Sequence, residues 1–457
     1  MSESNFQTHS RLTDDRSKVM SRYMLPYGDK GMEIDVPDKN FLYYAEPVTS
    51  REIPDQDRII TEAFGHPIGT GRLEDMVCPE QEIVILLDDI TRPTPKRILL
   101  QEVLRRLEHA GVPDSRITLI MALGTHRILT EDEIETHIGM DIIKRFRFLN
   151  LDYKDSSVFV DLGRSRNGTP IQVYRQVVEA GFKIAIGNIV PHIAAGWGGG
   201  CKMIQPGVCS ERTTEITHLM ACTLQNVLES CGTTDNLCRR EMEEITAMVG
   251  LDFIVNTVMD EDKHILGLFC GHFVEAHRAG VLLAEQVMCP VIPRRADIVI
   301  ASAAPADIDF WQGCKPYIFS HFGLRDNGVI IFVIRGKEGL CGNAPQHEAT
   351  LRRYGSTDFT KIKQEVDAGR ITDLVGANVP LFIASVRERA TVLCVSEGFS
   401  EQDIRDIGFI PCNTVEAALD QAFGYLGAEA SVGIIPFCGE TLVRCACSTE
   451  QQRPAKQ

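Results

Sequence analysis

The chain has few tryptophans and no long apolar run. Only two tryptophans, Trp197 and Trp311, occur among its 457 residues. No stretch approaches the ~18 consecutive apolar residues that a membrane-spanning helix needs. Residues 1–22 are polar and charged, without the apolar core of a secretory signal, and we expect a disordered leader there. The lack of a membrane-spanning run and of a secretory signal favours a cytoplasmic protein.

Motifs for zinc and for nucleotide phosphates are also missing. The 15 cysteines form no C-x-x-C pair and no H-E-x-x-H segment occurs, which argues against zinc-ribbon and zincin-type sites. In a chain of this length, scattered cysteines predict reduced thiols rather than a disulfide framework. Neither a Walker loop nor the G-x-G-x-x-G fingerprint of dinucleotide folds is present.

The charge balance narrows the choice of partners. The chain has 47 Lys and Arg against 63 Asp and Glu, a formal net charge of −16. Such an acidic surface repels phosphate backbones and anionic lipid, so we expect neither nucleic acid nor a membrane as a partner. An anionic small molecule remains a candidate ligand, because a pocket can be basic inside an acidic shell.

Short apolar runs alternate with amphipathic segments, which is typical of a mostly parallel sheet covered by helices on both faces. In the first half we predict, in order, strand 82–87, helix 97–109, strand 116–123, helix 130–137 with a capping box from Thr130 to Glu133, strand 182–190 and a helix around 211–220. A helix is predicted over 274–287. Beyond it, further strands are predicted at 297–301, 328–334, 380–385, 391–395 and 431–435.

The two sets of elements predict an α/β protein with two α/β lobes, mostly parallel sheets and a ligand cleft between the lobes. Residues 32–47 alternate like an exposed antiparallel strand or hairpin, and a hinge is expected near residues 286–296. The expected parts are a leader (1–22), an N-terminal domain (23–288), a C-terminal domain (289–447) and a polar tail (448–457).

Binding sites in open α/β sheets collect at the carboxyl ends of strands, and four loops in such places carry unusual residues. The first, DDITRPTPKR at residues 88–97, combines Asp89, Thr91 and Arg92 with two prolines at a predicted helix start. A helix N-terminus favours an anion, and Arg92 offers a donor fork for carboxylate or phosphate. A polar loop with a structural Asp–Arg pair explains this loop alone equally well.

The second and third loops supply histidines and a lysine. GTHR places His126 directly after a strand, where an imidazole can titrate near neutrality, although a loop histidine bonded to backbone is the commoner case. The third loop, PHIAAGWGGGCKMIQPG, holds His192, Lys202 and glycines that let backbone approach a ligand closely. A lysine in such a cleft can be a nucleophile or an attachment point. A lone histidine on a helix is usually structural, so His218, on the next helix, is a candidate metal ligand only together with the residues of these loops.

The fourth loop is DIDFWQGCK. On a helix, Gln312 and Lys315 share a face and could grip an anion or a polar group. Trp197 and Trp311 lie in the third and fourth loops and could wall a pocket, although packing explains large aromatics more often. Two cysteines directly precede the loop lysines and are expected to be small, buried and inert: Cys201 and Cys314.

Together these loops resemble the nickel-dependent lactate racemase family. The resemblance runs from about Tyr23 to Arg444 and includes D-x-T-R-P-x-P, G-x-H-R, H-x-x-x-G-x-x-G-G-x-K-x-x-x-P-G, a following histidine and a late Q-x-x-K, in the same order. It implies an isomerase, a racemase or epimerase that inverts C2 of a 2-hydroxy acid. Relatives act on lactate, longer, dicarboxylic and sugar acids, so no substrate name is carried over.

The resemblance also implies a nickel-pincer nucleotide in the cleft between the lobes. This is a pyridinium-3,5-bisthiocarboxylic acid mononucleotide that holds nickel through two sulfurs and a ring carbon. Lys202 would be joined to it through a thioamide and His218 would be the fourth nickel ligand, which suits a square-planar site. Enzymes of cofactor biosynthesis are implied as partners. Cofactor contacts are implied for Asp89, Thr91, Arg92, Gln312 and Lys315.

In the implied mechanism, one of His126 and His192 takes the hydroxyl proton while hydride passes from C2 to the pincer ring, leaving a 2-keto acid. The keto acid rotates, hydride returns to its other face, and the second histidine restores the proton. Arg92 and Lys315 would hold the carboxylate during the rotation. Substrate contacts are implied for Arg92, Lys315, Trp197 and Trp311.

Other functions remain open. A zinc or iron hydro-lyase could use His192, His218 and a carboxylate, but it would need a third protein ligand at metal spacing. A non-catalytic protein that carries the pincer nucleotide would keep Lys202 and His218 and would need neither His126 nor His192. A pyridoxal-phosphate enzyme is a weaker option suggested by the cleft lysine. For the racemase we expect the three histidines and Lys202 to converge on one cleft.

Overall fold

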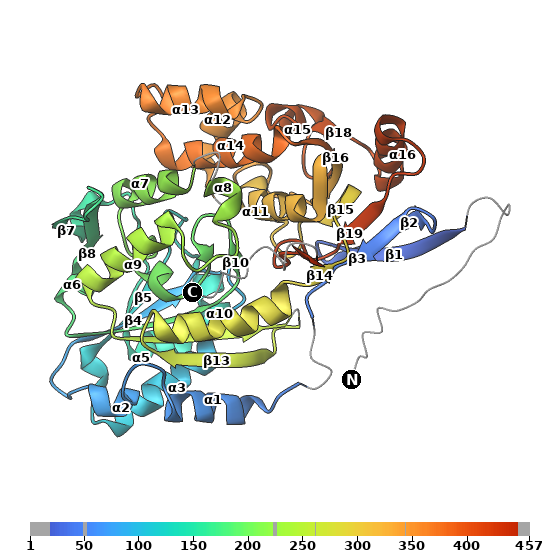
Figure 1. Ribbon diagram of the computed structural model, residues 1–457. Helices are drawn as coiled ribbons and strands as arrows, with labels where there is room; N and C mark the ends of the chain where they lie inside the picture. The colour runs from blue at the N-terminus through green and yellow to red at the C-terminus, as the bar shows by residue number, and fades with distance from the viewer. Residues whose placement is uncertain (1–18, 49–52, 223–225, 261, 343, 447–457) are drawn as a thin grey trace, which may run out of the picture. The chain divides into compact units, whose positions relative to one another are not determined.

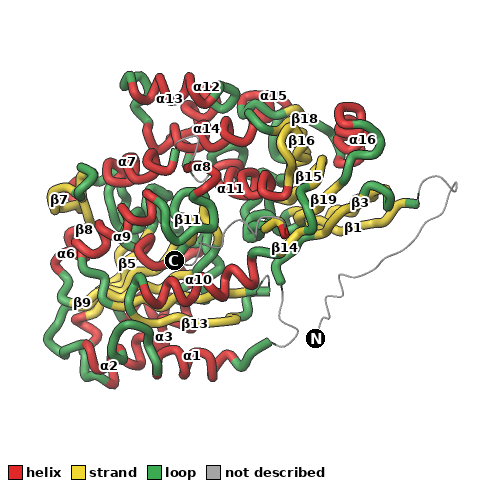
Figure 2. The backbone as a smooth tube through the Cα atoms, viewed as in Figure 1, coloured by secondary structure: helices red, strands yellow, loops and turns green. Residues whose placement is uncertain are grey.

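The computed structural model describes residues 19–48, 53–222, 226–260, 262–342 and 344–446. The chain divides into two compact units. We call them the mid-chain unit, Thr49–Val287, and the terminal unit, which joins Met1–Val48 to Met288–Gln457. Strands and helices alternate through both units (Figures 1 and 2).

The mid-chain unit is built on a six-stranded sheet with the order β13-β12-β9-β4-β5-β6. Its strands are parallel apart from β13, which pairs antiparallel with β12. The elements are α1 (Gln56–Gly65), α2 (Leu73–Met76), β4 (Ile83–Asp88), α3 (Lys96–His109), η1 (Asp114–Arg116), β5 (Ile117–Ala122), α4 (Glu131–His137), α5 (Met140–Arg145), β6 (Arg147–Leu149), η2 (Ser156–Val158), β7 (Phe159–Arg164), β8 (Pro170–Tyr174), α6 (Arg175–Glu179), β9 (Phe182–Asn188), β10 (Pro191–His192), β11 (Gly196–Trp197), η3 (Gly200–Met203), α7 (Glu211–Ala221), α8 (Asn226–Glu229), α9 (Leu237–Val249), β12 (Phe253–Met259), β13 (Ile265–Gly271) and α10 (Glu275–Met288).

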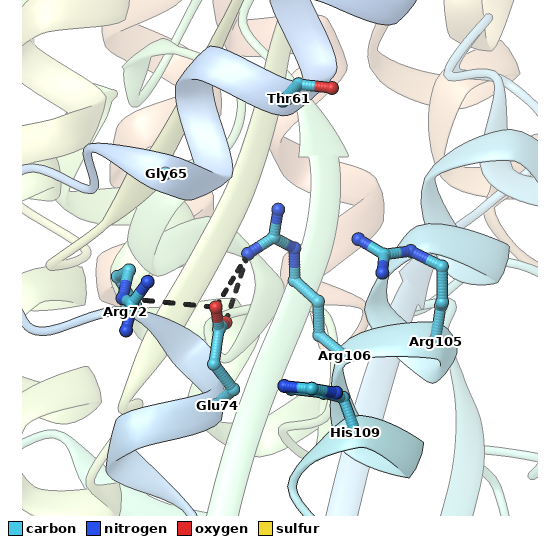
Figure 3. A pocket seen from close by; sticks show the side chains of 7 residues that line it. All are labelled: Thr61, Gly65, Arg72, Glu74, Arg105, Arg106 and His109. Carbon is cyan, nitrogen blue, oxygen red and sulfur yellow. Dashed lines mark hydrogen bonds and ion pairs between the residues drawn. The ribbon is translucent and has the colours of Figure 1, made fainter.

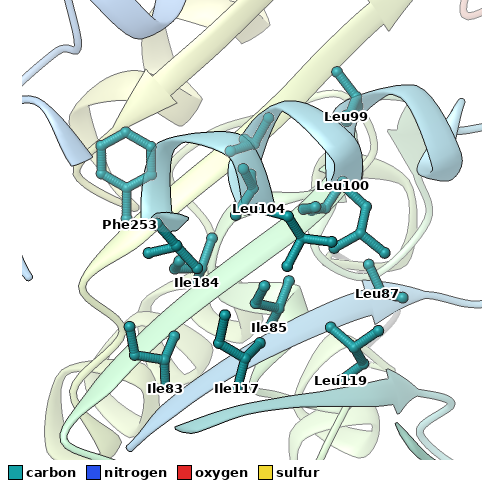
Figure 4. Close-up of a cluster of buried hydrophobic side chains, with 14 of the residues drawn as sticks. Ile83, Ile85, Leu87, Leu99, Leu100, Leu104, Ile117, Leu119, Ile184 and Phe253 are labelled. Atoms are coloured by element: carbon teal, nitrogen blue, oxygen red, sulfur yellow. The ribbon is translucent and has the colours of Figure 1, made fainter. Parts of the chain in front are cut away.

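The central strand of this sheet, β4, is buried along its whole length, which is why its sequence is a continuous apolar run. Helix α3 covers one face of the sheet. Leu99, Leu100 and Leu104 lie on its inner side and face Ile85 and Leu87 (Figure 4). This spacing is that of an amphipathic helix, so burial of the stripe explains why residues 96–109 fold as predicted.

The terminal unit has its own six-stranded sheet with the order β18-β17-β16-β15-β19-β3, in which every neighbouring pair is parallel. Its elements are β1 (Met20–Tyr27), β2 (Lys30–Pro37), β3 (Phe41–Tyr44), β14 (Val291–Ile292), β15 (Ala296–Ser302), α11 (Phe310–Ser320), η4 (His321–Gly323), β16 (Leu324–Val333), η5 (Pro345–His347), α12 (Glu348–Tyr354), α13 (Phe359–Asp367), α14 (Leu374–Arg387), β17 (Ala390–Val395), α15 (Glu401–Asp406), β18 (Ile410–Pro411), α16 (Val415–Leu426), β19 (Val432–Ile435) and β20 (Arg444–Cys445). The predicted α/β class with mostly parallel sheets is confirmed.

The N-terminal segment corrects the predicted domain boundaries. β1 pairs antiparallel with β2, and β3 joins the terminal sheet in parallel beside β19. Leu25, Ile34 and Val36 of the hairpin belong to the same apolar core as Ile298 and Ile300. Residues 23–48 therefore belong to the terminal unit, not to the domain predicted at 23–288. The last residues of the predicted leader, 20–22, lie in strand β1, whereas residues 1–18 lie outside the described residues.

One predicted strand is wrong. Residues 380–385 lie inside α14, a helix buried over most of its length. A short apolar run has no periodicity that separates a buried strand from a buried helix. The helix begins after Asp373, whose side chain accepts a hydrogen bond from the Gly376 amide. By contrast, the capping box of Thr130 and Glu133 at the start of α4 is confirmed.

Candidate functional site

The first three predicted loops begin at the ends of neighbouring parallel strands. β9, β4 and β5 are adjacent in the mid-chain sheet, so the loops after them start at the same edge. The Gly124 amide, after β5, donates to the carbonyl of Gly207, at the end of the glycine-rich loop, at 2.9 Å. The structure thus joins segments that are about eighty residues apart in the sequence.

His126 is held by a carboxylate. Its Nδ1 lies 2.5 Å from Oδ2 of Asp89. The other oxygen of Asp89 accepts the Thr91 amide at 2.8 Å and the Thr91 hydroxyl. Burial opposes ionisation of Asp89, but His126, Arg92 and Thr91 outweigh it and hold its pKa well below the usual range. An ionised carboxylate only accepts, so Nδ1 of His126 carries a proton, and in the neutral ring Nε2 then carries the lone pair.

The loop that presents Arg92 is braced by a buried ion pair. Lys96 is 1 % exposed, and its Nζ lies 2.9 Å from Asp88 Oδ1 and donates to the Arg92 carbonyl at 3.1 Å. Asp88 also accepts the Thr94 hydroxyl at 2.5 Å. The Arg92 guanidinium in turn donates to the Thr91 hydroxyl at 3.1 Å. Asp89, Thr91 and Arg92 therefore form one ordered loop.

The glycine-rich loop brings His192 and Lys202 together. Nδ1 of the buried His192 accepts the amides of Ala194 and Ala195 at 3.2 and 3.1 Å. An Nδ1 that accepts places the proton of the neutral ring on Nε2. Nζ of Lys202 lies 3.4 Å from this Nε2. Burial, with help from Arg92, lowers the pKa of Lys202 to about 8.

Close backbone packing explains the glycines of this loop. Gly199 has a φ of +68°, and a Cβ there would lie 2.6 Å from Oδ1 of Asn256. That oxygen accepts the Gly200 amide at 2.7 Å. A Cβ on Gly196 would lie 1.8 Å from the Thr233 carbonyl. Side chains at these positions would push the loop away from its supports.

His218 lies on α7, which begins after its N-cap Ser210. Its Nδ1 is 3.0 Å from the carbonyl of Thr214, one turn earlier, so Nδ1 donates and Nε2 carries the lone pair. Metal-bound histidines are usually oriented in this way. The side chain of Gln205, which follows the Lys202 segment, donates to Thr217 on the same helix. That bond fastens α7 to the glycine-rich loop.

The fourth loop is in the terminal unit. Gln312 and Lys315 lie on α11, and Lys315 Nζ donates to Gln312 Oε1 at 2.7 Å, which confirms that they share a helix face. The ring of Trp311 stacks on His347 with 4.7 Å between centroids. Nδ1 of His347 lies 2.8 Å from Asp373 Oδ1. The structure places this group in a different unit from His126 and His192.

Comparison with known proteins agrees with this order of loops. The lactate racemase N-terminal domain family matches residues 27–229, and the lactate racemase C-terminal domain family matches residues 291–441. The chain belongs to the lactate racemase family. It is therefore an enzyme of a racemase family, an isomerase.

Two curated lactate racemases are similar to this chain. The protein from Lactiplantibacillus plantarum is 26% identical over 90% of this chain and 97% of its own length. The protein from Thermoanaerobacterium thermosaccharolyticum is 26% identical over 93% of this chain and 100% of its own length.

Two solved structures are also similar. The lactate racemase apoprotein of Thermoanaerobacterium thermosaccharolyticum has a TM-score of 0.83 at 26% identity, covering 93% of this chain and 100% of that one. A Thermotoga maritima protein has a TM-score of 0.70 at 19% identity, covering 87% of this chain and 100% of that one, which supports the fold alone.

The structure places some of the predicted site residues more deeply than the sequence suggests. Trp197 is fully buried, and its Nε1 has no hydrogen-bond partner among the described residues. This burial favours packing over contact with a substrate. Cys201 and Cys314 are buried too, and burial raises the pKa of each thiol, that of Cys314 to about 12. Both have the properties of inert thiols.

Two supports of the glycine-rich loop are missing from the sequence-based prediction. Arg239 on α9 and His277 on α10 are both fully buried. Nε2 of His277 lies 2.7 Å from the Gly198 carbonyl, and burial and Arg239 hold the pKa of His277 well below its usual value. One signal could have found Arg239. It lies at helical spacing on the apolar stripe of α9 with Met242 and Thr246.

A cavity of about 280 Å³ is found elsewhere in the mid-chain unit (Figure 3). It lies at the C-terminal end of α3, about 20 Å along the helix from the Arg92 loop. Its lining includes three arginines and His109. Three carboxylates form ion pairs with the arginines, with N···O distances of 2.7–3.0 Å. Those arginines are Arg72, Arg105 and Arg106, and their partners are Asp75, Glu102 and Glu74. The cavity is thus charge-balanced and lies away from the loop that carries Arg92.

Two absences bear on metals and membranes. Within the described ranges, no three His, Cys, Asp or Glu side chains gather as possible ligands of one ion. Across the same part of the chain, no helix is both long and apolar enough to cross a bilayer.

Proposed function

We propose that this lactate racemase family member is a racemase or epimerase that inverts C2 of a 2-hydroxy acid through a 2-keto acid. The observation that carries the proposal is the pair formed by Lys202 and His192, whose Nζ and Nε2 atoms lie 3.4 Å apart in the glycine-rich loop. His126, which follows β5 and is oriented by Asp89 at the end of β4, supplies the second imidazole. Two imidazoles are what inversion through a planar intermediate requires, since the hydroxyl groups of the two stereoisomers point to opposite sides.

The residues present fit a nickel-pincer nucleotide. The lowered pKa of Lys202, about 8, leaves a useful fraction of neutral amine for a covalent link. The orientation of His218 presents the Nε2 lone pair that a nickel ligand needs. When bound, the nucleotide would take up and return the hydride of C2. Further contacts with it are proposed for Asp89, Thr91, Arg92, Gln312 and Lys315.

The two neutral histidine rings present different groups to the reaction, because they are opposite tautomers. His126 presents an Nε2 lone pair and can accept the hydroxyl proton, and Asp89 stabilises the imidazolium that results. His192 holds a proton at Nε2 and can donate a hydrogen bond to the substrate oxygen, as a neutral imidazole does when it polarises a carbonyl. From this difference we propose His126 as the base and His192 as the hydrogen-bond donor.

The remaining roles concern orientation. Arg92 and Lys315 are proposed to hold the substrate carboxylate through the rotation of the keto acid, which is positioning work. Trp311 is the better candidate of the two tryptophans for contact with the substrate side chain, because Trp197 is fully buried. The size and charge of the substrate's side chain are what distinguish one 2-hydroxy acid from another.

The test is the mass of the Lys202 peptide after co-expression with the pincer-making enzymes, together with nickel content. We expect one cofactor mass on Lys202 and one nickel per chain, followed by interconversion of stereoisomers in a screen of chiral 2-hydroxy acids. A Lys202→Arg variant is the matched control and should carry neither. Unmodified Lys202 without nickel, in cells that load a known racemase, would overturn the cofactor assignment. A loaded chain that inverts no acid, and behaves the same when His126 is replaced, would instead be a carrier.

A further inference from the structure

Arg239 is a fully buried cation with an unusual set of partners. Its guanidinium donates to the carbonyl of Ala195 at 3.0 Å, to the carbonyl of Trp197, and to Sγ of Cys201 at 3.0 Å. It forms no ion pair with any carboxylate among the described residues. All three acceptors lie between His192 and Lys202 in the glycine-rich loop.

These partners are weak compensation for a buried charge. A buried guanidinium is normally balanced by a carboxylate, because taking the charge out of water costs several kcal/mol. Neutral carbonyls and a thiol return only part of that cost through charge-assisted hydrogen bonds. Arg239 is therefore poorly explained as a device for stability. Its planar fork, which fixes three acceptors at once, suits a role in setting the shape of the loop.

The bonds of Arg239 lead directly to the two reactive side chains. Ala195, whose carbonyl Arg239 holds, also donates its amide to Nδ1 of His192 at 3.1 Å. Together with the Ala194 amide, it makes Nδ1 an acceptor and so places the proton of the neutral His192 ring on Nε2. Cys201, whose sulfur Arg239 also holds, is the residue immediately before Lys202. One guanidinium thus holds the backbone of the segment that runs from His192 to Lys202.

We propose that Arg239 is a positioning residue that sets the tautomer of His192 and the approach of Lys202 to it. The assignment rests on the proposed function for its catalytic meaning, but its geometric content concerns the chain alone. Without the fork, the backbone that follows Ala195 loses its anchor, and the neighbouring amides of Ala194 and Ala195 are free to move away from Nδ1 of His192. The ring then takes up its proton on either nitrogen, and Lys202 loses its fixed neighbour.

The tautomer of His192 is the readout, measured by ¹⁵N NMR on the unloaded, histidine-labelled chain with His192→Gln for assignment. The wild type should show an unprotonated Nδ1 and a protonated Nε2. In Arg239→Met the two tautomers should mix, and the Ala194 and Ala195 amides should exchange with solvent about tenfold faster or more. Arg239→Lys, which keeps the charge but can hold fewer acceptors, should fall between the two.

Arg106→Met is the matched control, because Arg106 is a buried arginine of the same unit that pairs with Glu74 and Glu102 instead. It should leave the His192 signals unchanged. The proposal is overturned if folded Arg239→Met keeps the wild-type tautomer, or if Arg106→Met changes it equally. Should Arg239→Met not fold, Arg239→Lys decides by the same criterion. None of these readouts needs cofactor or activity, so a failed racemase assay leaves them interpretable.

Discussion

The amine of Lys202 should titrate far below an ordinary lysine. Burial and the nearby Arg92 lower its pKa from 10.5 to about 8. At pH 7 about one such amine in ten is neutral, against about one in three thousand for an ordinary lysine, a ratio of ~300. Since only the neutral amine is a nucleophile, Lys202 should react with amine reagents at pH values where other lysines are silent.

Competitive labelling measures this directly. The folded, unloaded chain is exposed briefly to light acetic anhydride at a series of pH values, then unfolded and labelled to completion with the heavy form. The light fraction of the Lys202 peptide, followed by mass spectrometry, should rise with a midpoint near pH 8, with exposed Lys361 as the internal reference. Arg92→Met should move the midpoint of Lys202 upwards, because it removes a neighbouring positive charge. A Lys202 midpoint at or above that of Lys361 would refute the electrostatic account of the loop.

The same group makes a prediction about stability. Between about pH 8 and 10.5 the folded chain binds fewer protons at Lys202 than the unfolded chain does. Stability therefore rises with pH across this window, and the charged amine costs stability below it. Lys202→Met should unfold at a higher temperature than the wild type at pH 7, and the difference should shrink towards pH 10.5. A difference that is constant with pH would contradict the linkage.

Three further predictions concern the supporting structure. Although burial opposes ionisation, His347 and neighbouring donors lower the pKa of Asp373, so its stabilisation is present above about pH 4 and lost as the pH falls through its folded-state pKa. Asp373→Asn should therefore lower the melting temperature at pH 7 and flatten its dependence on acid, and an unchanged acid limb would exclude this pair as a contributor. Ile85→Ala, in the centre of the mid-chain core, should cost ~2–5 kcal/mol in urea unfolding, with a loss below 1 kcal/mol contradicting the packing of Figure 4. Thr130→Ala should cost ~1 kcal/mol through the lost cap of α4, whereas Thr136→Ala on the same helix serves as the control.

The fold followed from apolar patterning wherever a segment had only one way to bury its side chains. The run at 82–87 is apolar throughout and short, and it is the central strand β4. The run at 380–385 has the same character but lies in a helix that is buried on all sides, so its pattern contains no period to read. The placement of β3 beside β19 was not predictable either, because it depends on a pairing between residues nearly four hundred positions apart.

The sequence offered candidate residues for the site but not the contacts that hold them. Short motifs identified His126, His192 and Lys202 because strand ends and glycines mark loops that reach a ligand. The partner of each one comes from tertiary structure. Asp89 is separated from His126 by a whole βα unit, and Arg239 lies on a helix that carries no motif. Sequence alone therefore left the protonation state of each histidine undecided.

The difference between the two histidines leads to a prediction with a strict thermodynamic limit. Asp89→Asn removes the carboxylate that orients His126 and stabilises its imidazolium, so kcat/KM for inversion should fall by ~10²–10⁴. Mirror-image substrates have equal free energies, so kcat/KM must fall by the same factor in both directions, even though the catalytic groups are not equivalent. The asymmetry of the catalytic groups can therefore show only in kcat and KM taken separately. For one enantiomer kcat should fall by the larger factor, and for the other KM should rise by the larger factor. Chiral chromatography of initial rates from each pure enantiomer measures all four constants. For a substrate whose only stereocentre is C2, two kcat/KM values that differ would show that the measured reaction is not a simple inversion. The assignment of His126 and His192 as opposed groups would instead fail if kcat and KM changed by the same factors for both enantiomers.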